Sequence, residues 1–160
     1  MKRALVAYFS ASGQTARLAR TLATVVGGEL HEIRPQVPYD KADLDWRDPN
    51  SRSSLEMKRP SARPPLADTV VDMDRYDTVF VGFPIWWYEA PRIVQTFLER
   101  YDFSGKTVIP FATSGSSGMG KTDAILKACC SPQTQWRPGR RMSSGESEQE
   151  VRSWVESLGL

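Results

Sequence analysis

The chain has 160 residues, of which 40% are hydrophobic and 25% are charged. This length predicts one domain, 1–160, and the composition is that of a globular protein, not of a disordered, collagen-like or coiled-coil chain. Because no stretch approaches the ~18 apolar residues that cross a bilayer, we expect no membrane span.

The charge balance and the cysteines narrow the class of protein further. Lys and Arg number 21 and Asp and Glu number 19, and the two signs are interspersed, so nucleic-acid binding is not expected. Cys129 and Cys130 are adjacent and could close a disulfide only with strain, which indicates a reducing compartment. The apolar run at 4–9 is shorter than the ~7–15 residues of a signal-peptide core. We therefore expect a cytoplasmic protein.

Strand and helix patterns alternate along the chain. Mostly apolar runs predict strands buried on both faces, at 3–9, 78–83 and 107–112. Shorter segments predict two further strands, at 29–33 and 134–136. Apolar residues at helical spacing predict the helices, at 15–26, from Pro91 to Tyr101, around 125–129, and from Ser147, where Glu150 completes a capping box. This alternation is typical of an open parallel α/β sheet with helices on both faces.

One segment, 35–68, interrupts the alternation. It follows the second predicted strand and holds more than half of the 11 prolines. Connections in compact domains are commonly about 4–6 residues, so a segment of this length is usually a lid, a binding loop or disordered. Short helices are predicted at 40–46 and 51–58, and the apolar residues are too few for a second domain.

The first candidate loop follows the first strand and opens the first helix, with the residues Ser10, Ala11, Ser12, Gly13, Gln14 and Thr15. A helix N-terminus offers free N–H groups and a partial positive charge, and Gly13 permits close approach of a ligand. The loop therefore suits a phosphate. The alternative, equally open at this point, is that Ser12 or Gln14 caps the helix and Gly13 makes the turn.

The second candidate loop follows the third strand, with the residues Pro84, Ile85, Trp86, Trp87 and Tyr88. Three consecutive aromatic residues cannot all enter one core, so at least one is expected at the carboxyl edge of the sheet, where it could stack on a flat ligand. The alternative is one core tryptophan and one at a subunit contact.

The third candidate loop, 113–122, follows the fourth strand. Its residues Gly115 to Thr122 match the phosphate loop of nucleotide hydrolases. Such enzymes also need a strand that ends in Asp to hold Mg²⁺, and no such strand is predicted. We therefore interpret the match as chance and keep a nucleotide hydrolase only as an alternative from another class. His31, the single histidine, lies away from these loops, and no metal site is expected.

In a doubly wound sheet of order 2-1-3-4-5 the three loops meet at one crevice. The crevice would hold a phosphate, a linker and a flat heteroaromatic ring, and FMN has these parts. The sequence resembles the flavodoxin family over nearly its whole length, in particular short members with a Pro-Ile-Trp second loop. The resemblance implies a flavodoxin-like, doubly wound, five-stranded parallel sheet of order 2-1-3-4-5, with 35–68 inserted after strand 2.

The resemblance also implies roles for the loop residues. Phosphate contacts are implied for Ser10, Ser12, Gly13, Gln14 and Thr15, and contacts with the ribityl chain and one ring face for Pro84, Ile85, Trp86 and Trp87. By position, Trp86 is the stacking aromatic. Backbone contacts with the pyrimidine edge are implied for Thr113, Ser114, Gly115, Ser116 and Gly118. The flavin would carry the chemistry, so no catalytic residue is predicted.

Departures from the family bear on what the flavin would do. The chain is weakly basic, the third loop lacks a second stacking aromatic, and Trp87 stands where glycine is frequent. Glycine adopts positive φ freely and a bulky residue resists it, so we expect Trp87 to disfavour one-electron chemistry.

The predicted function is a flavodoxin-like FMN-binding redox protein. The alternative is a small NAD(P)H-quinone-type flavin reductase.

The same prediction covers the partners. We expect a redox partner protein or a small acceptor such as a quinone, and a monomer or homodimer. The role of 35–68 would be that of a lid or a contact surface.

Overall fold

The computed structural model describes residues 3–114 and 118–160. Its centre is a parallel sheet in which the predicted order 2-1-3-4-5 is confirmed. The first four strands are β1 (Ala4–Tyr8), β2 (Glu29–Glu32), β3 (Thr78–Pro84) and β4 (Thr107–Thr113). The long apolar runs form β1, β3 and β4, which lie inside the sheet and are almost entirely buried.

The fifth strand is in two pieces, whereas the sequence predicts one short strand at 134–136. β5 (Gln135–Trp136) pairs with the start of β4, and β6 (Arg140–Met142) pairs with its end. The break faces Pro110 in β4, which has no N–H to donate to a neighbouring strand. Gly139 lies in the break, where the space is too small for a side chain. A Cβ there would lie 2.7 Å from Pro110 Cγ and 2.6 Å from Met119 Cε.

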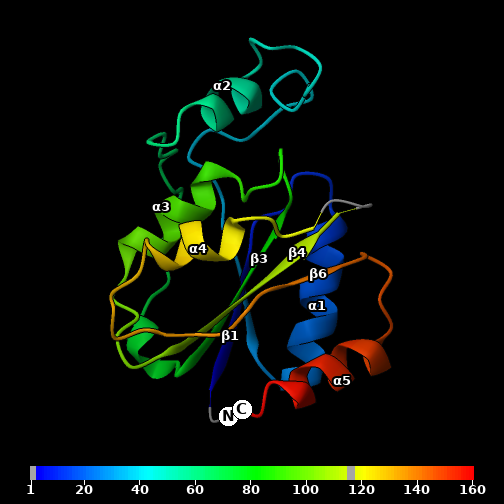
Figure 1. Cartoon of the computed structure of the whole chain (residues 1–160), viewed down its shortest axis with the longest axis vertical. Helices are drawn as coiled ribbons and strands as arrows, with labels where there is room; N and C mark the ends of the chain where they lie inside the picture. Colours follow the sequence, from blue (N-terminus) through cyan, green and yellow to red (C-terminus); the bar gives the residue numbers. More distant parts are fainter. Residues whose placement is uncertain (1–2, 115–117) are drawn as a thin grey trace.

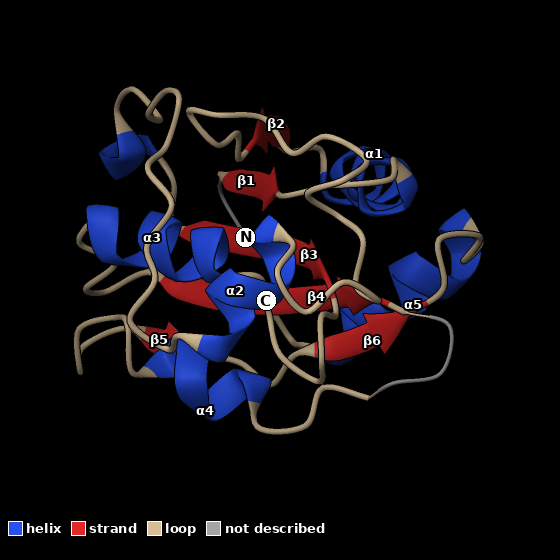
Figure 2. Ribbon diagram, turned by 90° about the horizontal axis from the view of Figure 1, so that it is seen from above, coloured by secondary structure: helices blue, strands red, loops and turns tan. Residues whose placement is uncertain are grey.

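Helices cover both faces of the sheet. One face carries α1 (Gln14–Val26) and α5 (Glu148–Ser157), and the other carries α3 (Arg92–Arg100) and α4 (Thr122–Lys127). Figure 2 shows the two layers from above. Alternate residues of each strand enter opposite cores: Ala4 and Val6 face α1, whereas Leu5 and Ala7 face α3. None of the helices in the described ranges is long and apolar enough to cross a membrane.

The insertion, defined as residues 35–68, forms an ordered lobe beyond the carboxyl ends of the strands (Figure 1). It holds α2 (Arg52–Lys58), as the pattern at 51–58 predicts. The helix predicted at 40–46 is wrong, since this segment consists of turns and irregular chain. The carboxylates of Asp40 and Asp43 accept from each other's backbone N–H groups at 2.7 and 3.0 Å, which satisfies the backbone in turns instead of a helix. A single-turn helix, η1 (Met73–Arg75), follows before β3.

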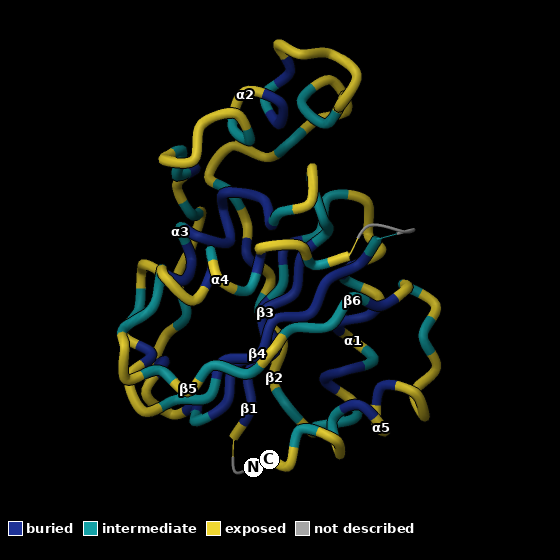
Figure 3. The backbone as a smooth tube through the Cα atoms, in the orientation of Figure 1, coloured by how far each residue is buried: buried dark blue, intermediate teal, exposed yellow. Residues whose placement is uncertain are grey.

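Contacts at its base and at its far side help to fasten the insertion to the rest of the chain. At its base, Gln36 N–H donates to Pro65 O at 2.8 Å and Ala67 N–H donates to Arg34 O at 2.8 Å. At its far side, Arg92 of α3 donates to the carbonyl of Met57 at 2.8 Å and to that of Glu56 at 3.4 Å. Arg92 is only 2% exposed. Most of the lobe is otherwise exposed, in contrast to the strands (Figure 3).

Candidate functional site

The first loop leaves the N-terminus of α1 open. Gly13 is the N-cap residue with φ 88°. Because glycine has no side chain, the N-cap residue itself accepts no side-chain hydrogen bond from the first turn of α1. The structure thus gives neither Ser12 nor Gln14 the capping role that the sequence left open. Instead, the Ser10 hydroxyl folds under the turn and accepts from the N–H groups of Gly13 at 3.1 Å and Ala16 at 3.2 Å.

Unpaired donors remain at this helix end. The N–H groups of Gln14 and Thr15 have no acceptor among the described residues, and the exposed side chains of Ser12 and Gln14 have no hydrogen-bond partner there either. These donors lie at the positive end of a 13-residue helix. Such an arrangement suits an anion that carries several acceptor oxygens.

Thr15 has a second role that the sequence does not reveal. Its hydroxyl is buried and lies 2.7 Å from the hydroxyl of Thr113, the last residue of β4. This contact joins the first loop to the start of the third. Of the polar groups of Thr15, its backbone N–H is the one left free for a ligand.

The second loop is a tight hairpin. Trp86 N–H donates to Glu89 O at 2.8 Å, and Glu89 N–H donates back to Trp86 O at 3.0 Å. The two residues between them, Trp87 and Tyr88, have φ values of 48° and 65°. Positive φ at both central positions is the type I′ geometry, which asparagine and glycine prefer. A left-handed conformation costs a residue with a Cβ about 1–2 kcal/mol.

Trp87 adopts positive φ, the conformation in which the sequence predicts a cost for a bulky residue. The expected effect of Trp87 on one-electron chemistry stays a prediction. The surroundings hold the turn in place. Thr122 Oγ1 donates to Tyr88 O at 3.2 Å, and Arg92 pairs with the carboxylate of Glu89 at 2.9 Å. Burial of these two supports, at 0% exposure for Thr122 and 2% for Arg92, makes the turn a fixed feature.

Trp86 and Trp87 have different environments. Trp86 is half-buried and meets the rings of Phe9 and Tyr39 edge to face, each at 5.7 Å between centroids. Burial raises the pKa of Tyr39, and the hydrogen bond that its hydroxyl donates to Glu56 acts in the same direction. Trp87 is 44% exposed and Tyr88 is 67% exposed. The prediction of at least one exposed aromatic in this loop is confirmed.

The third loop is only partly described. Ser114 accepts two hydrogen bonds from Arg141 of β6, at 3.1 Å to its hydroxyl and 3.0 Å to its carbonyl. Gly115 and Ser116 lie outside the described residues, and Gly118 is exposed. Arg141 was not singled out by the sequence, because no local pattern brings a residue of the last strand to this loop.

The described part of the phosphate-loop match does not support a hydrolase. In that motif the Thr hydroxyl holds Mg²⁺. Here the corresponding Thr122 is fully buried and its hydroxyl is bonded to Tyr88 O. The helix that follows, α4, has only six residues.

The insertion, for which the sequence predicts a lid or a contact surface, borders the second loop, and the residues that it brings there were not predicted. A cavity of about 340 Å³ lies between the second loop and the insertion, lined by Ile85, Trp86, Trp87, Leu44, Trp46 and Ser53. A second, of about 380 Å³, lies between the first loop and the base of the insertion. Trp46 and Leu44 line the first of these cavities because of how a proline-rich segment without a periodic pattern folds, so no sequence signal indicates them.

Comparison with known proteins agrees with this architecture. The sequence profile of the flavodoxin family matches residues 3–158. A protein described as a flavoprotein from Bacteroides eggerthii DSM 20697 is 46% identical, with a TM-score of 0.93 over 99% of this chain and 98% of its own. Another from Bacteroides uniformis ATCC 8492 is 48% identical, with a TM-score of 0.91 over 96% and 97%.

A more distant solved structure is that of a flavoprotein from Lactobacillus acidophilus NCFM in complex with FMN. It is 20% identical, with a TM-score of 0.71 over 97% of this chain and 99% of that chain. The comparison with curated proteins finds no match. The fold and the three loops define an α/β protein of the flavodoxin-like class. The chain belongs to the flavodoxin family.

Proposed function

We propose that the chain binds FMN non-covalently and transfers electrons through it. The observation that carries the proposal is the open N-terminus of α1, where the N–H groups of Gln14 and Thr15, beside the hydroxyl of Ser12, have no acceptor within residues 3–114 and 118–160. Membership of the flavodoxin family and an FMN-bound structural neighbour support this cofactor. Bound FMN would supply the electron-accepting and electron-donating ring.

The phosphate would lie at the first loop. Ser12, Gln14 and the backbone of Gly13 and Thr15 would donate hydrogen bonds to it, while Ser10 holds the turn through Gly13 and Ala16. The cradle contains no Lys or Arg, so neutral donors and the helix dipole would carry the binding. Hydrogen bonds to a charged group contribute about 1.5–3 kcal/mol each.

The ring would lie between the second and third loops. Trp86 is fixed by Phe9 and Tyr39, so it offers a rigid apolar wall. Arg141 holds Ser114 at the start of the third loop, where backbone N–H groups would face the pyrimidine edge. The alternative for the second loop, one core tryptophan and one at a subunit contact, is not favoured by the cavity beside Trp86.

One observation favours the alternative function, a small flavin reductase. The insertion lines one side of a cavity of about 340 Å³ over the second loop, a volume within the range of small-molecule sites. A carrier that serves only large protein partners does not need a walled space of this kind. A redox partner protein could still dock at the exposed Tyr88.

Both cysteines are unpaired, which supports a cytoplasmic location.

The test is to identify the cofactor of the purified protein. We expect a yellow protein that releases FMN on heating, close to one per chain. A colourless protein that does not take up added FMN would contradict the proposal, and Mg²⁺-dependent stabilisation by ATP would favour the hydrolase. Turnover of a quinone with NAD(P)H in the absence of a partner protein would distinguish the reductase from the carrier.

A further inference from the structure

Two tryptophans from segments far apart in the sequence line the same pair of cavities. Trp46 of the insertion and Trp87 of the second loop both border the cavity of about 340 Å³ and a neighbouring one of about 370 Å³. Their side chains are exposed, Trp46 at 66%. Tryptophan is highly buried on average, so two exposed indoles beside the same cavities need an explanation. The space that both tryptophans line is called the slot.

The backbone of Trp87 gives a second, independent observation. It is held at positive φ by the closed hairpin and by the bond from Thr122 to Tyr88 O. The strained position leaves the indole exposed rather than packed into the core. Strain maintained at an exposed side chain points to a role in binding, since packing does not account for it.

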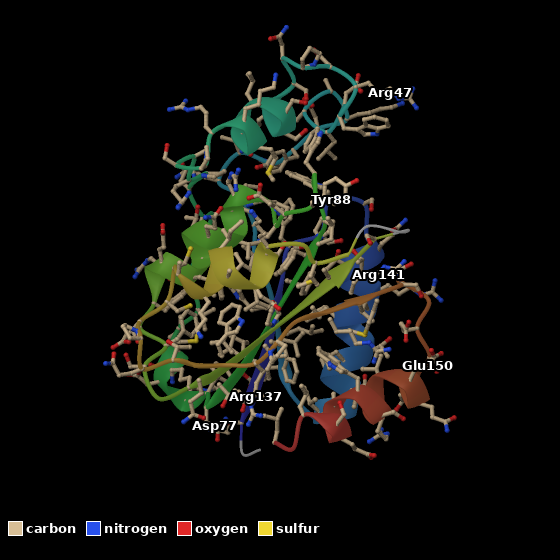
Figure 4. All side chains as sticks on the ribbon, viewed as in Figure 1. Arg47, Asp77, Tyr88, Arg137, Arg141 and Glu150 are labelled. Atoms are coloured by element: carbon tan, nitrogen blue, oxygen red, sulfur yellow. The ribbon has the colours of Figure 1, made fainter. Side chains whose placement is uncertain are left out.

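The charges at one end of the slot indicate the kind of ligand. Arg47 and Lys58 both line the cavity of about 370 Å³, and no described residue that lines it carries a carboxylate. The Arg47 guanidinium lies 5.3 Å from the centroid of the Trp46 ring, and Lys58 Nζ donates to Pro49 O at 2.9 Å. The other lining residues are neutral, such as Ser54 and Met57. In Figure 4, Arg47 lies at the edge of the lobe, above Tyr88.

We propose that this slot, between Trp46 and Trp87 with Arg47 and Lys58 at one end, binds planar aromatic anions such as a quinone that carries a sulfonate or carboxylate. The indole faces would stack on the rings, and the two cations would pair with the anionic group. The cavity volumes suit a two-ring compound. This proposal goes beyond the proposed function, because neither the first loop nor Trp86 lines the cavity of about 370 Å³, so binding there does not require FMN.

The test is calorimetric titration with two probes, 1,4-naphthoquinone-2-sulfonate and the neutral 2-methyl-1,4-naphthoquinone. Both the flavin-free and the FMN-saturated protein are titrated. We expect the sulfonate to bind about tenfold more tightly at low ionic strength, with the preference reduced by salt because both cations are exposed. Equal affinity for the two probes would overturn the proposal.

Variants test the residues separately. Lys58→Gln should weaken the sulfonate about fivefold and leave the neutral quinone unchanged, because only the anion meets the charge. Arg59→Gln is the matched control, since Arg59 is the exposed neighbour and does not line the cavity. Trp46→Ala should weaken both probes about tenfold, whereas Trp46→Phe keeps an aromatic face and retains most of the affinity.

Two further results would overturn the proposal: Lys58→Gln behaving like Arg59→Gln, or Trp46→Ala and Trp46→Phe both binding like the unmodified protein. FMN titrations of the same preparations keep this proposal distinct from the proposed function. Binding of the sulfonate without FMN binding would overturn the proposed function alone. Binding of FMN without a preference for the sulfonate would overturn only the slot.

Discussion

Trp87 and Tyr88 occupy backbone positions that residues without a Cβ, or with short polar side chains, normally take. The hairpin between Trp86 and Glu89 imposes positive φ on both. Residue type alone predicts that this conformation costs energy at Trp87, and it does not show whether contacts from other elements offset that cost. The supports that override the preference, Thr122 and Arg92, come from later elements.

Two variants at position 87 measure this strain. Trp87→Gly and Trp87→Ala remove the same indole, but only alanine keeps a Cβ at positive φ. We expect the glycine variant to have the larger free energy of unfolding, by about 1 kcal/mol, in urea titrations. At Trp46, where φ is not positive, the order should reverse. An alanine variant at position 87 as stable as the glycine variant would contradict the account of the turn.

The variant Ser12→Ala measures how much one hydroxyl of the first loop contributes to FMN affinity. Ser12→Ala should weaken FMN about tenfold or more and leave riboflavin unchanged, because the hydroxyl would meet only the phosphate. Thr24→Ala is the control, since the Thr24 hydroxyl lies near the other end of α1 and donates to Arg20 O. Fluorescence titration with both flavins measures the effect. Equal losses for FMN and riboflavin would remove Ser12 from the phosphate site.

At the scale of elements, the strands and helices with strong patterns were predicted almost to the residue. The runs that form β1, β3 and β4 are apolar on both faces because helices cover both. The predicted elements are wrong where single residues change which backbone groups can form hydrogen bonds. Asp40 and Asp43 replace a predicted helix with turns, and Pro110 divides the fifth strand. Neither effect alters hydrophobic periodicity, so the pattern alone could not show it.

Arg92 fastens one element to another. It holds the carbonyls at the end of α2, and hydrogen bonds to a charged group contribute about 1.5–3 kcal/mol each. Arg92→Met should therefore loosen the insertion and speed its cleavage by thermolysin at 35–68 more than tenfold, as about 1.4 kcal/mol is a factor of ten.

The control for this prediction is Arg34→Met. Arg34 pairs with Asp68 at the base of the insertion, where the side chains are 56% and 41% exposed. Exposed pairs contribute about 0–1 kcal/mol, so little change in cleavage is expected. An insertion cut no faster in Arg92→Met than in Arg34→Met would contradict the anchoring role.

At the scale of the whole molecule, the single histidine links stability to pH. His31 is half-buried and stacks on Phe97 with 6.0 Å between centroids. Burial is the main cause that lowers its pKa; Arg34 acts in the same direction, against Asp68 and Glu32. The unfolded chain therefore binds a proton at higher pH than the folded one. Stability is lost as the pH falls from about 6.5 toward the folded pKa.

Urea unfolding of the unmodified protein and His31→Gln checks this sign. From about pH 7.5 to about pH 5.5, the unmodified protein should lose more free energy of unfolding than the variant, because only it carries the histidine. Above about pH 7.5 the histidine is neutral in both states and its titration contributes nothing. Equal losses in the two proteins would contradict the effect of burial on His31.

The site as a whole could be predicted only in part. The three loops follow strands that the sequence marks clearly, and parallel order brings their carboxyl ends together. The contributions of Trp46, Arg141 and Arg92 depend on contacts between segments far apart in the chain. Such contacts follow from packing and leave no local pattern. The position of the three loops can therefore be predicted from the sequence, whereas the insertion residues that line the cavity beside the second loop are seen only in the structure.

The central claim is that the open end of α1 binds the phosphate of FMN. The most direct measurement is titration of the flavin-free protein with FMN and with riboflavin, which differ only in that phosphate. We expect FMN to bind one per chain and at least about a hundredfold more tightly, from two or more hydrogen bonds to a charged group. Equal affinity for the two flavins, or no binding of either, would contradict the account.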